Sequence, residues 1–350
     1  MNGGGEMIEE EVIALGDLSH EEWLGYVEDH GWGDGLPTIP PTQEAVDRFV
    51  AHLGKELAAV APIPPRGVVP TVASLAANAV MAGCRPEDSP LVLAALRATL
   101  RPDFNLHGIL ATTHSCTPMM IVSGPVRHEL GINCGPNCLG QGARANATIG
   151  RALHLILTNL GGAYPGTMDR ATQGAPTKFT YCFGENEEAS PWEPYHVRLG
   201  FAASDSVVTV AATEPPHNIN DHGSTSGDEI LTTIAGTVSE TGTNNLYLGG
   251  PHFLVLGPEH AATLARDGWT VPRIKHEIYT RSRIHSSRVS TGNRTQFEGH
   301  GIEPEDEHYR VSTGTDQVHV LVAGGPGKHS VWIPSFGATA ACSEGVSLDR

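Results

Sequence analysis

The residues whose types and spacing best suit chemistry gather between positions 114 and 151. Three of the six cysteines lie in this stretch. Cys116 directly precedes an apolar run, while Cys134 and Cys138 flank a Gly-Pro-Asn turn that can bring two sulfur atoms together. Thiolates bind Zn²⁺, Cu(I) and iron–sulfur clusters, and three protein ligands leave one metal position open for a substrate. The pattern predicts a metal ion or iron–sulfur cluster on Cys116, Cys134 and Cys138, with small buried thiols as the alternative.

Two short segments around these cysteines resemble known cluster-binding sequences. HSCT (114–117) and CGPNCLG (134–140) are similar to the cysteine segments of aconitase-type iron–sulfur hydro-lyases, although the pair is spaced C-x3-C here instead of C-x2-C. The resemblance implies a cluster that acts as a Lewis acid in a lyase or hydratase step. Without a metal, Cys134 and Cys138 are candidates for a dithiol that cycles to a disulfide.

The stretch after the cysteine pair has the features of an anion site. A Gly-rich loop leads into a helix predicted over residues 145–160, whose first N–H groups and positive dipole end favour a negative ligand. Two arginines lie on or beside this helix, where a guanidinium can bind a carboxylate or phosphate with two hydrogen bonds. The loop AGGPGKHS (323–330) also follows an apolar run. The residues expected to bind substrate are Arg144, Asn146, Arg151, Lys328 and His329; surface salt bridges are the alternative for the arginines.

Residues 215–225 (PPHNINDHGST) combine two imidazoles with a carboxylate in a tight turn. His217, Asp221 and His222 are therefore candidates for proton transfer, as is Cys116 beside His114. Ordinary turn formation and helix capping are the alternative for this segment.

Residues 185–196 (ENEEASPWEPYH) carry four glutamates. Paired carboxylates can transfer protons or bind hard cations. Such runs are usually solvated, so we expect an exposed acidic loop here, with Asn186 and Trp192 near the rim of the site.

Three apolar runs end in Gly-Pro and then present a histidine: IVSGPVRH (121–128), LVLGPEH (254–260) and LVAGGPGKH (321–329). In open α/β sheets, ligands bind beyond the carboxyl ends of the strands. His128, His260 and His329 are therefore candidates to face one pocket, and Gly-Pro as simple strand punctuation is the alternative.

The elements that position these residues indicate an α/β protein with a helical N-terminal third followed by strand–loop–helix units. We predict a flexible leader at 1–16, a mainly helical region at 17–110, and an α/β region at 111–350 that contains the site; the last two form either separate regions or one continuous domain. Helices are predicted near 21–30, 43–53, 72–82 and 90–99, and strands at 207–212, 253–257 and 317–325. Residues 281–312 are predicted to form a long polar loop.

Composition excludes several functions. The formal net charge of −17 argues against nucleic-acid binding, which needs a basic surface. The sequence contains no apolar run long enough to span a bilayer and no signal-peptide pattern, so we expect a cytoplasmic protein with reduced thiols and no membrane partner. No G-x-G-x-x-G or P-loop motif predicts NAD or nucleotide binding. The Gly/Pro-rich loops suit a homo-oligomer.

Longer segments carry a second resemblance. DGLPTIPPT (34–42), RANATIGRALHLIL (144–157), PHNINDHGSTS (216–226) and AGGPGKHSVWIPSFG (323–337) resemble an uncharacterised bacterial family associated with UGSC-type (seleno)proteins. The resemblance spans about residues 30–337 and implies a bacterial enzyme-like protein with a redox or thiol connection.

Together these observations predict an enzyme that acts on a small anionic metabolite, with a metal- or cluster-assisted lyase or hydratase as the leading hypothesis. A thiol-redox enzyme using Cys134 and Cys138 is the second hypothesis. The third is a non-catalytic subunit that binds a metal or a metabolite.

Overall fold

The computed structural model of the chain describes residues 16, 18–53 and 60–348. It is a mixed α/β structure, 42% helix and 16% strand, built around two open four-stranded sheets. The α/β class predicted from the sequence is confirmed. The leader predicted at 1–16 lies outside the described residues except for Gly16.

The first sheet has the strand order β10-β3-β1-β2. β1 (Thr117–Ser123) lies between β3 (Val207–Thr213), to which it is antiparallel, and β2 (Cys182–Gly184), to which it is parallel; β10 (Cys342–Gly345) is antiparallel to β3. Every residue of β1 and β3 is buried. A strand covered on both faces reads as a nearly continuous apolar run, as these two do.

The second sheet repeats this arrangement with the order β4-β9-β5-β8. β5 (His252–Leu256) is antiparallel to β9 (His329–Ile333) and parallel to β8 (Val318–Val322), and β4 (His217–Asn220) is antiparallel to β9. In both sheets the central strand ends in Gly-Pro. A side chain on Gly124 would collide with the Asp205 carbonyl, and one on Gly257 with the His329 carbonyl, so both turns bring backbones too close for a Cβ atom.

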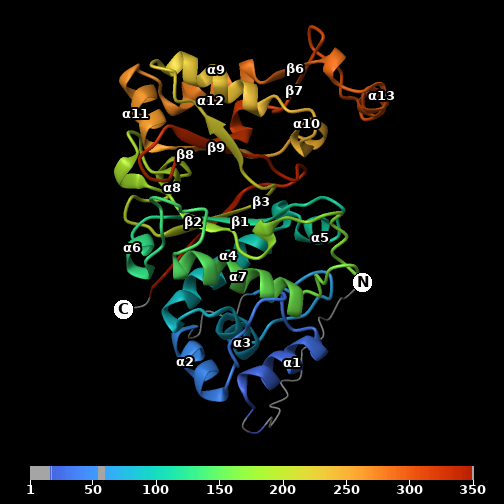
Figure 1. The fold of residues 1–350 in the computed structure, drawn as a ribbon, viewed down its shortest axis with the longest axis vertical. Coiled ribbons are helices and arrows are strands. Elements are labelled where there is room, and N and C mark those ends of the chain that lie inside the picture. Colours follow the sequence, from blue (N-terminus) through green and yellow to red (C-terminus); the bar gives the residue numbers. More distant parts are fainter. Residues whose placement is uncertain (1–15, 17, 54–59, 349–350) are drawn as a thin grey trace.

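Helices cover the outer faces of the sheets, and the sheets face each other (Figure 1). α4 (Ser89–Thr99) and α7 (Arg144–Asn159) pack on the first sheet, with α3 (Val72–Ala82), α1 (His20–His30) and α2 (Gln43–Leu53) outside them. α9 (Gly227–Val238), α11 (Pro258–Arg266) and α12 (Val271–Arg281) cover the second sheet. A third apolar layer, which includes Ile121 and Val255, fills the space between the sheets.

The remaining elements are short. They are α5 (Leu106–Leu110), α6 (Val126–Leu130), α8 (Tyr195–Arg198), α10 (Asn244–Leu248), α13 (Thr291–Gly299), β6 (Arg283–His285) and β7 (His308–Arg310). The long loop predicted at 281–312 is wrong, because this segment forms the β6–β7 pair and α13 around buried residues such as Phe297. Within the described part of the chain, no helix has both the length and the apolar character needed to cross a membrane.

His252 ties the second sheet to the loop after β7. Its side chain is fully buried; the Trp332 indole N–H donates to Nδ1 at 2.9 Å, and Nε2 lies 2.6 Å from Ser312 Oγ. An indole nitrogen only donates, so Nδ1 is the acceptor and the ring is neutral. Burial lowers the pKa of His252 to about 4.

We therefore expect acid to destabilise the protein through His252. The unfolded chain binds a proton at this histidine near pH 6.5, but the folded chain does not until about pH 4, so its contribution to stability is lost as pH falls between these values. Between pH 7 and 5 the loss is about 2 kcal/mol. Urea unfolding of wild type and His252→Gln at both pH values tests this: the variant starts less stable but loses less on acidification, and equal losses would contradict it.

Candidate functional site

A pocket of about 400 Å³ lies at the carboxyl ends of β5 and β8. Three segments form its wall: the loop 137–140, the ends of the two strands with the glycine-rich turn 323–327, and the first residues of β9. Cys138 and His329, both predicted site residues, line it. The remaining apolar lining comes from the layer between the sheets, including Val255 and Ala323.

Two imidazoles meet beside this pocket. Nε2 of His222 and Nε2 of His329 are 3.1 Å apart, and Nδ1 of His329 faces Asn218 Oδ1 at 2.9 Å. An amide oxygen only accepts, so this contact places a proton on Nδ1 of His329 and leaves Nε2 basic. The Lys328 ammonium donates to the His222 carbonyl at 3.1 Å. The structure thus brings Lys328, His222 and His329 together, although 106 residues separate the first two in the chain.

Asp221 directly precedes His222 in the chain and is only 7% exposed. Its carboxylate accepts hydrogen bonds from the Ser224 backbone and hydroxyl and from the Thr233 hydroxyl. Burial opposes ionisation, but the hydrogen bonds from Thr233 and Ser224 outweigh it and hold the pKa of Asp221 below its ordinary value. Asp221 is therefore an ionised anchor of the turn that carries His222.

The structure does not bring His217 to the pocket. His217 opens β4 opposite Trp332, three positions from the Asn220–His329 pair, and its Nδ1 contacts Glu240 at 3.1 Å. At ~3.3 Å per residue it lies roughly 10 Å from the imidazole pair. Of the three candidates in this segment, only Asp221 and His222 belong to the site.

The two arginines predicted to clamp an anion hold the fold instead. Arg151 makes two 2.7 Å hydrogen bonds to Asp34 and donates to the carbonyls of Leu36 and Pro37, which ties the Pro-rich segment to α7. Arg144 pairs with Asp88, which is 1% exposed, at 2.5 Å. Since carboxylates of the chain itself already occupy both guanidinium groups, neither arginine is available to the pocket.

Asn146 has a positioning role. Its Oδ1 accepts from the Asn133 N–H at 2.8 Å, and its Nδ2 donates to the carbonyls of Asn133 and Cys138 at 2.9 and 3.2 Å. The side chain is buried on α7, so it holds the loop 133–138 against the helix and thereby shapes one wall of the pocket.

The predicted ligand set of three cysteines needs a correction. Cys116 precedes β1, whereas Cys134 packs against Gly184, which pairs with Val122 near the other end of that strand. Six residues of strand at ~3.3 Å each separate the two cysteines by roughly 20 Å. Cys116 is buried, and burial raises the pKa of its thiol to about 12, as expected for an inert cysteine. Only Cys134 and Cys138 remain close to the pocket.

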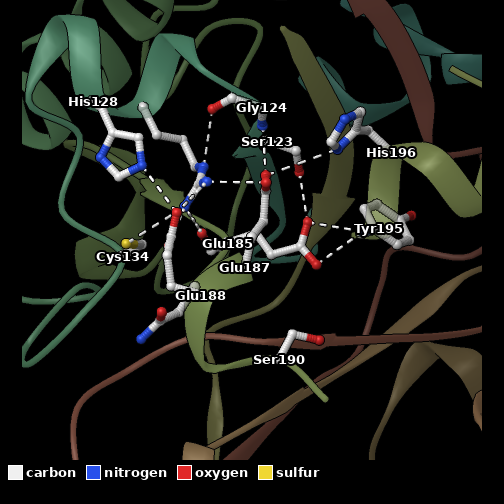
Figure 2. Close-up of polar contacts among 12 residues, drawn as sticks. Ser123, Gly124, His128, Cys134, Glu185, Glu187, Glu188, Ser190, Tyr195 and His196 are labelled. Atoms are coloured by element: carbon white, nitrogen blue, oxygen red, sulfur yellow. Dashed lines mark hydrogen bonds and ion pairs between the residues drawn. The ribbon is translucent and has the colours of Figure 1, made fainter. Parts of the chain in front are cut away.

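The glutamates of residues 185–188, which sequence reasoning placed on a solvated loop, form a cluster in which Glu185 is buried, Glu187 is partly buried and Glu188 is exposed. Glu185 is fully buried: Ser123 Oγ donates to it at 2.9 Å, as does the Tyr195 N–H (Figure 2). Burial, opposed by these hydrogen bonds, raises the pKa of Glu185 to about 7. The signal available in the sequence was its position directly after the buried strand β2, where polar residues meet the carboxyl edge of a sheet.

Arg127 on α6 is the cation of this cluster. Its guanidinium, 3% exposed, contacts Glu187 at 3.0 Å and Glu188 at 3.0 and 3.1 Å, and donates to the Glu185 carbonyl at 2.6 Å. The hydrogen bond from Arg127 lowers the pKa of Glu188 to about 2. Cys134 Sγ lies 3.8 Å from the same guanidinium.

Of the three histidines that follow Gly-Pro, only His329 lines the pocket. His260 is buried and contacts Ser330 Oγ at 2.8 Å, on the face of β9 opposite to the His329 side chain. His128 lies instead in the glutamate cluster, 3.0 Å from Glu188 (Figure 2). The cluster and the pocket are neighbours, because Asn186 donates to the carbonyl of Gly324 in the pocket wall.

Comparison with known proteins identifies no relative. No protein-family model matches the chain, and no curated protein and no solved structure is similar to it. The resemblances noted in the sequence therefore stay predictions, and function is argued from the site alone.

The structural role of Arg151 is testable. Arg151→Gln leaves Asp34, whose side chain is 15% exposed, without its partner, so we expect a loss of about 2–4 kcal/mol in unfolding free energy. The double variant Asp34→Asn/Arg151→Gln should lose less than the sum of the single variants, as denaturant unfolding would show. Arg48→Gln, at an exposed pair with Glu44, is the control and should leave stability unchanged. Additive losses at Asp34 and Arg151 would contradict this role.

Proposed function

We propose that the protein is an enzyme that binds a small anionic metabolite in the strand-end pocket and transfers protons on it. The observation that carries the proposal is that His222, itself held by Lys328, meets His329, which lines a pocket whose described lining residues include no carboxylate. This proposal adopts a finer description of the fold. A helical N-terminal region is followed by strand–loop–helix units, and the ligand binds at the loops that follow the strands.

The charges of the site favour a negative ligand. An ammonium group has three N–H donors, and Lys328 uses one on the His222 carbonyl, so the others can face a carboxylate or phosphate. Glycines at 324, 325 and 327 allow a ligand to approach the backbone closely. In a chain of net charge −17, the described lining of this pocket has no carboxylate, and Lys328 lies between two of its lining residues in the chain.

The imidazole pair supports a lyase or hydratase step without further groups. When the pair holds one extra proton, His222 is the imidazolium and His329, with its Nδ1 proton held by Asn218, is the base. His329 takes a proton from the carbon next to the substrate carboxylate, and the electron pair forms a C=C bond. The C–O bond on the adjacent carbon breaks at the same time, and the leaving hydroxide takes the His222 proton and departs as water. The proton on His329 then returns to His222 across the 3.1 Å contact.

A thiol-redox enzyme is the second candidate. Cys134 Sγ lies 3.8 Å from the Arg127 guanidinium, and Cys138 lines the pocket. Burial raises the pKa of Cys138 to about 11, which argues against Cys138 as the attacking thiol. Mass spectrometry after mild oxidation distinguishes this candidate, because it requires a reducible Cys134–Cys138 disulfide. A thiol-bound metal centre in the pocket would have only these two cysteines.

We expect Lys328→Ala to weaken binding of a small carboxylate at least about tenfold, since it removes a charged donor. His329→Ala should lower the elimination rate on a hydroxy acid by about 100-fold or more. Thermal shifts over a panel of hydroxycarboxylates give affinity, and the ultraviolet absorbance of the conjugated product gives the rate.

His217→Ala removes a histidine of the same sheet outside the pocket and is the control. The proposal fails if Lys328→Ala and His329→Ala bind and react like wild type and the control. Saturable binding with no turnover of any panel member would favour a non-catalytic binding subunit.

A further inference from the structure

His196 is a buried imidazole without a hydrogen-bond partner. It lies on α8, is fully buried, and neither ring nitrogen is hydrogen-bonded within the part of the chain that the structure describes. A polar group buried without a partner costs about 1–3 kcal/mol, so such a group needs a reason. The nearest charged atom to Nδ1 is Oε1 of Glu187, at 3.8 Å, which is too long for a hydrogen bond.

The imidazole faces two carboxylates (Figure 2). One ligand atom each from Glu185, Glu187 and His196 lie within 4.8 Å of one another, and these residues form the one such trio among the described histidines, cysteines, aspartates and glutamates. Ligand atoms that bind one tetrahedral ion at about 2.1 Å are about 3.4 Å apart. The longest separation in the trio would therefore shorten by up to about 1.4 Å when an ion binds.

Other groups hold the carboxylates in place for this role. One oxygen of Glu187 pairs with Arg127 at 3.0 Å, which leaves the other, Oε1, directed toward His196 and the Gly124 N–H. Ser123 Oγ and the Tyr195 N–H fix the Glu185 carboxylate. Ligating carboxylates in metal sites are typically oriented by such outer hydrogen bonds.

The charge of the cluster also calls for a further cation. Arg127 is shared by Glu187 and Glu188, while the groups that donate to the Glu185 carboxylate, Ser123 and the Tyr195 backbone, are neutral. Arg198, the other arginine near Glu185, donates instead to the carbonyls of Glu193 and Val320. A divalent ion would supply the missing charge and occupy the unpartnered imidazole.

We propose that Glu185, Glu187 and His196 bind a divalent first-row transition metal ion at the carboxyl ends of β1 and β2. Two carboxylates with one imidazole suit Mn²⁺, Fe²⁺ or Zn²⁺, whereas Mg²⁺ and Ca²⁺ prefer oxygen ligands alone. The site differs from the predicted cysteine centre in every ligand, and it stands whether or not the strand-end pocket is catalytic.

The test is a titration of chelator-treated full-length protein with Mn²⁺, which favours oxygen and nitrogen ligands over thiols. We expect one ion per chain, and at least about 100-fold weaker binding in Glu185→Gln and in His196→Gln, since each removes a direct ligand. His128→Ala and Glu188→Gln, which change the same cluster outside the trio, should bind Mn²⁺ within a few fold of wild type. Circular dichroism verifies that each variant is folded.

Unchanged affinity in folded Glu185→Gln and His196→Gln, or no stoichiometric binding by wild type, would overturn the proposal. A second measurement needs no variant: anomalous scattering from crystals soaked in Mn²⁺ should give a peak between the three side chains. A peak on the His222–His329 pair alone would place the ion elsewhere and refute the site. Mg²⁺ at the same concentration should produce no competition.

Discussion

Alternate side chains of the central strands β1 and β5 enter an apolar layer between the two sheets, and the others enter layers covered by helices. A strand enclosed in this way has no position along its length where a charged group can be solvated. Chemistry is thereby confined to the strand ends, where loops and helix starts meet water or each other. Both the pocket and the glutamate cluster lie at such ends, because the packing of the sheets leaves no other place for them near the core.

The charged groups at the strand ends differ between the two sheets. At the second sheet, His329 lines an open pocket, and Lys328 and His222 lie beside it. At the first sheet, three glutamates crowd around one buried guanidinium. Burying a charge is costly unless it is paired, so the buried charged groups at the first sheet depend on their contacts with one another. The groups at the pocket of the second sheet can instead exchange their partners with solvent. Asn186 joins the two ends through the Gly324 carbonyl.

Local patterns predicted the elements well. The helices at 43–53 and 72–82 begin and end as predicted, because their apolar spacing and, in the second, a Thr71 cap are local features. Lys328 lies on a loop after an apolar run as predicted, since strand ends can be recognised in a sequence, but His329 is already the first residue of β9. The sequence did not indicate which charged side chains pair with each other in the fold. Arg151 lies 117 residues from Asp34, and no local pattern distinguishes that pairing from a free guanidinium waiting for a ligand. The burial of Glu185 depends equally on helices and loops remote in the chain.

The strand order repeats in the two sheets, and so does the Gly-Pro ending. The outer antiparallel strands are exchanged between the sheets: β4 follows β3 of the first sheet but lies in the second, and β10 follows β9 of the second sheet but lies in the first. Neither sheet is therefore built from one continuous segment. Separating the two sheets would remove an edge strand from each, so the topology couples both halves of the fold into one cooperative unit.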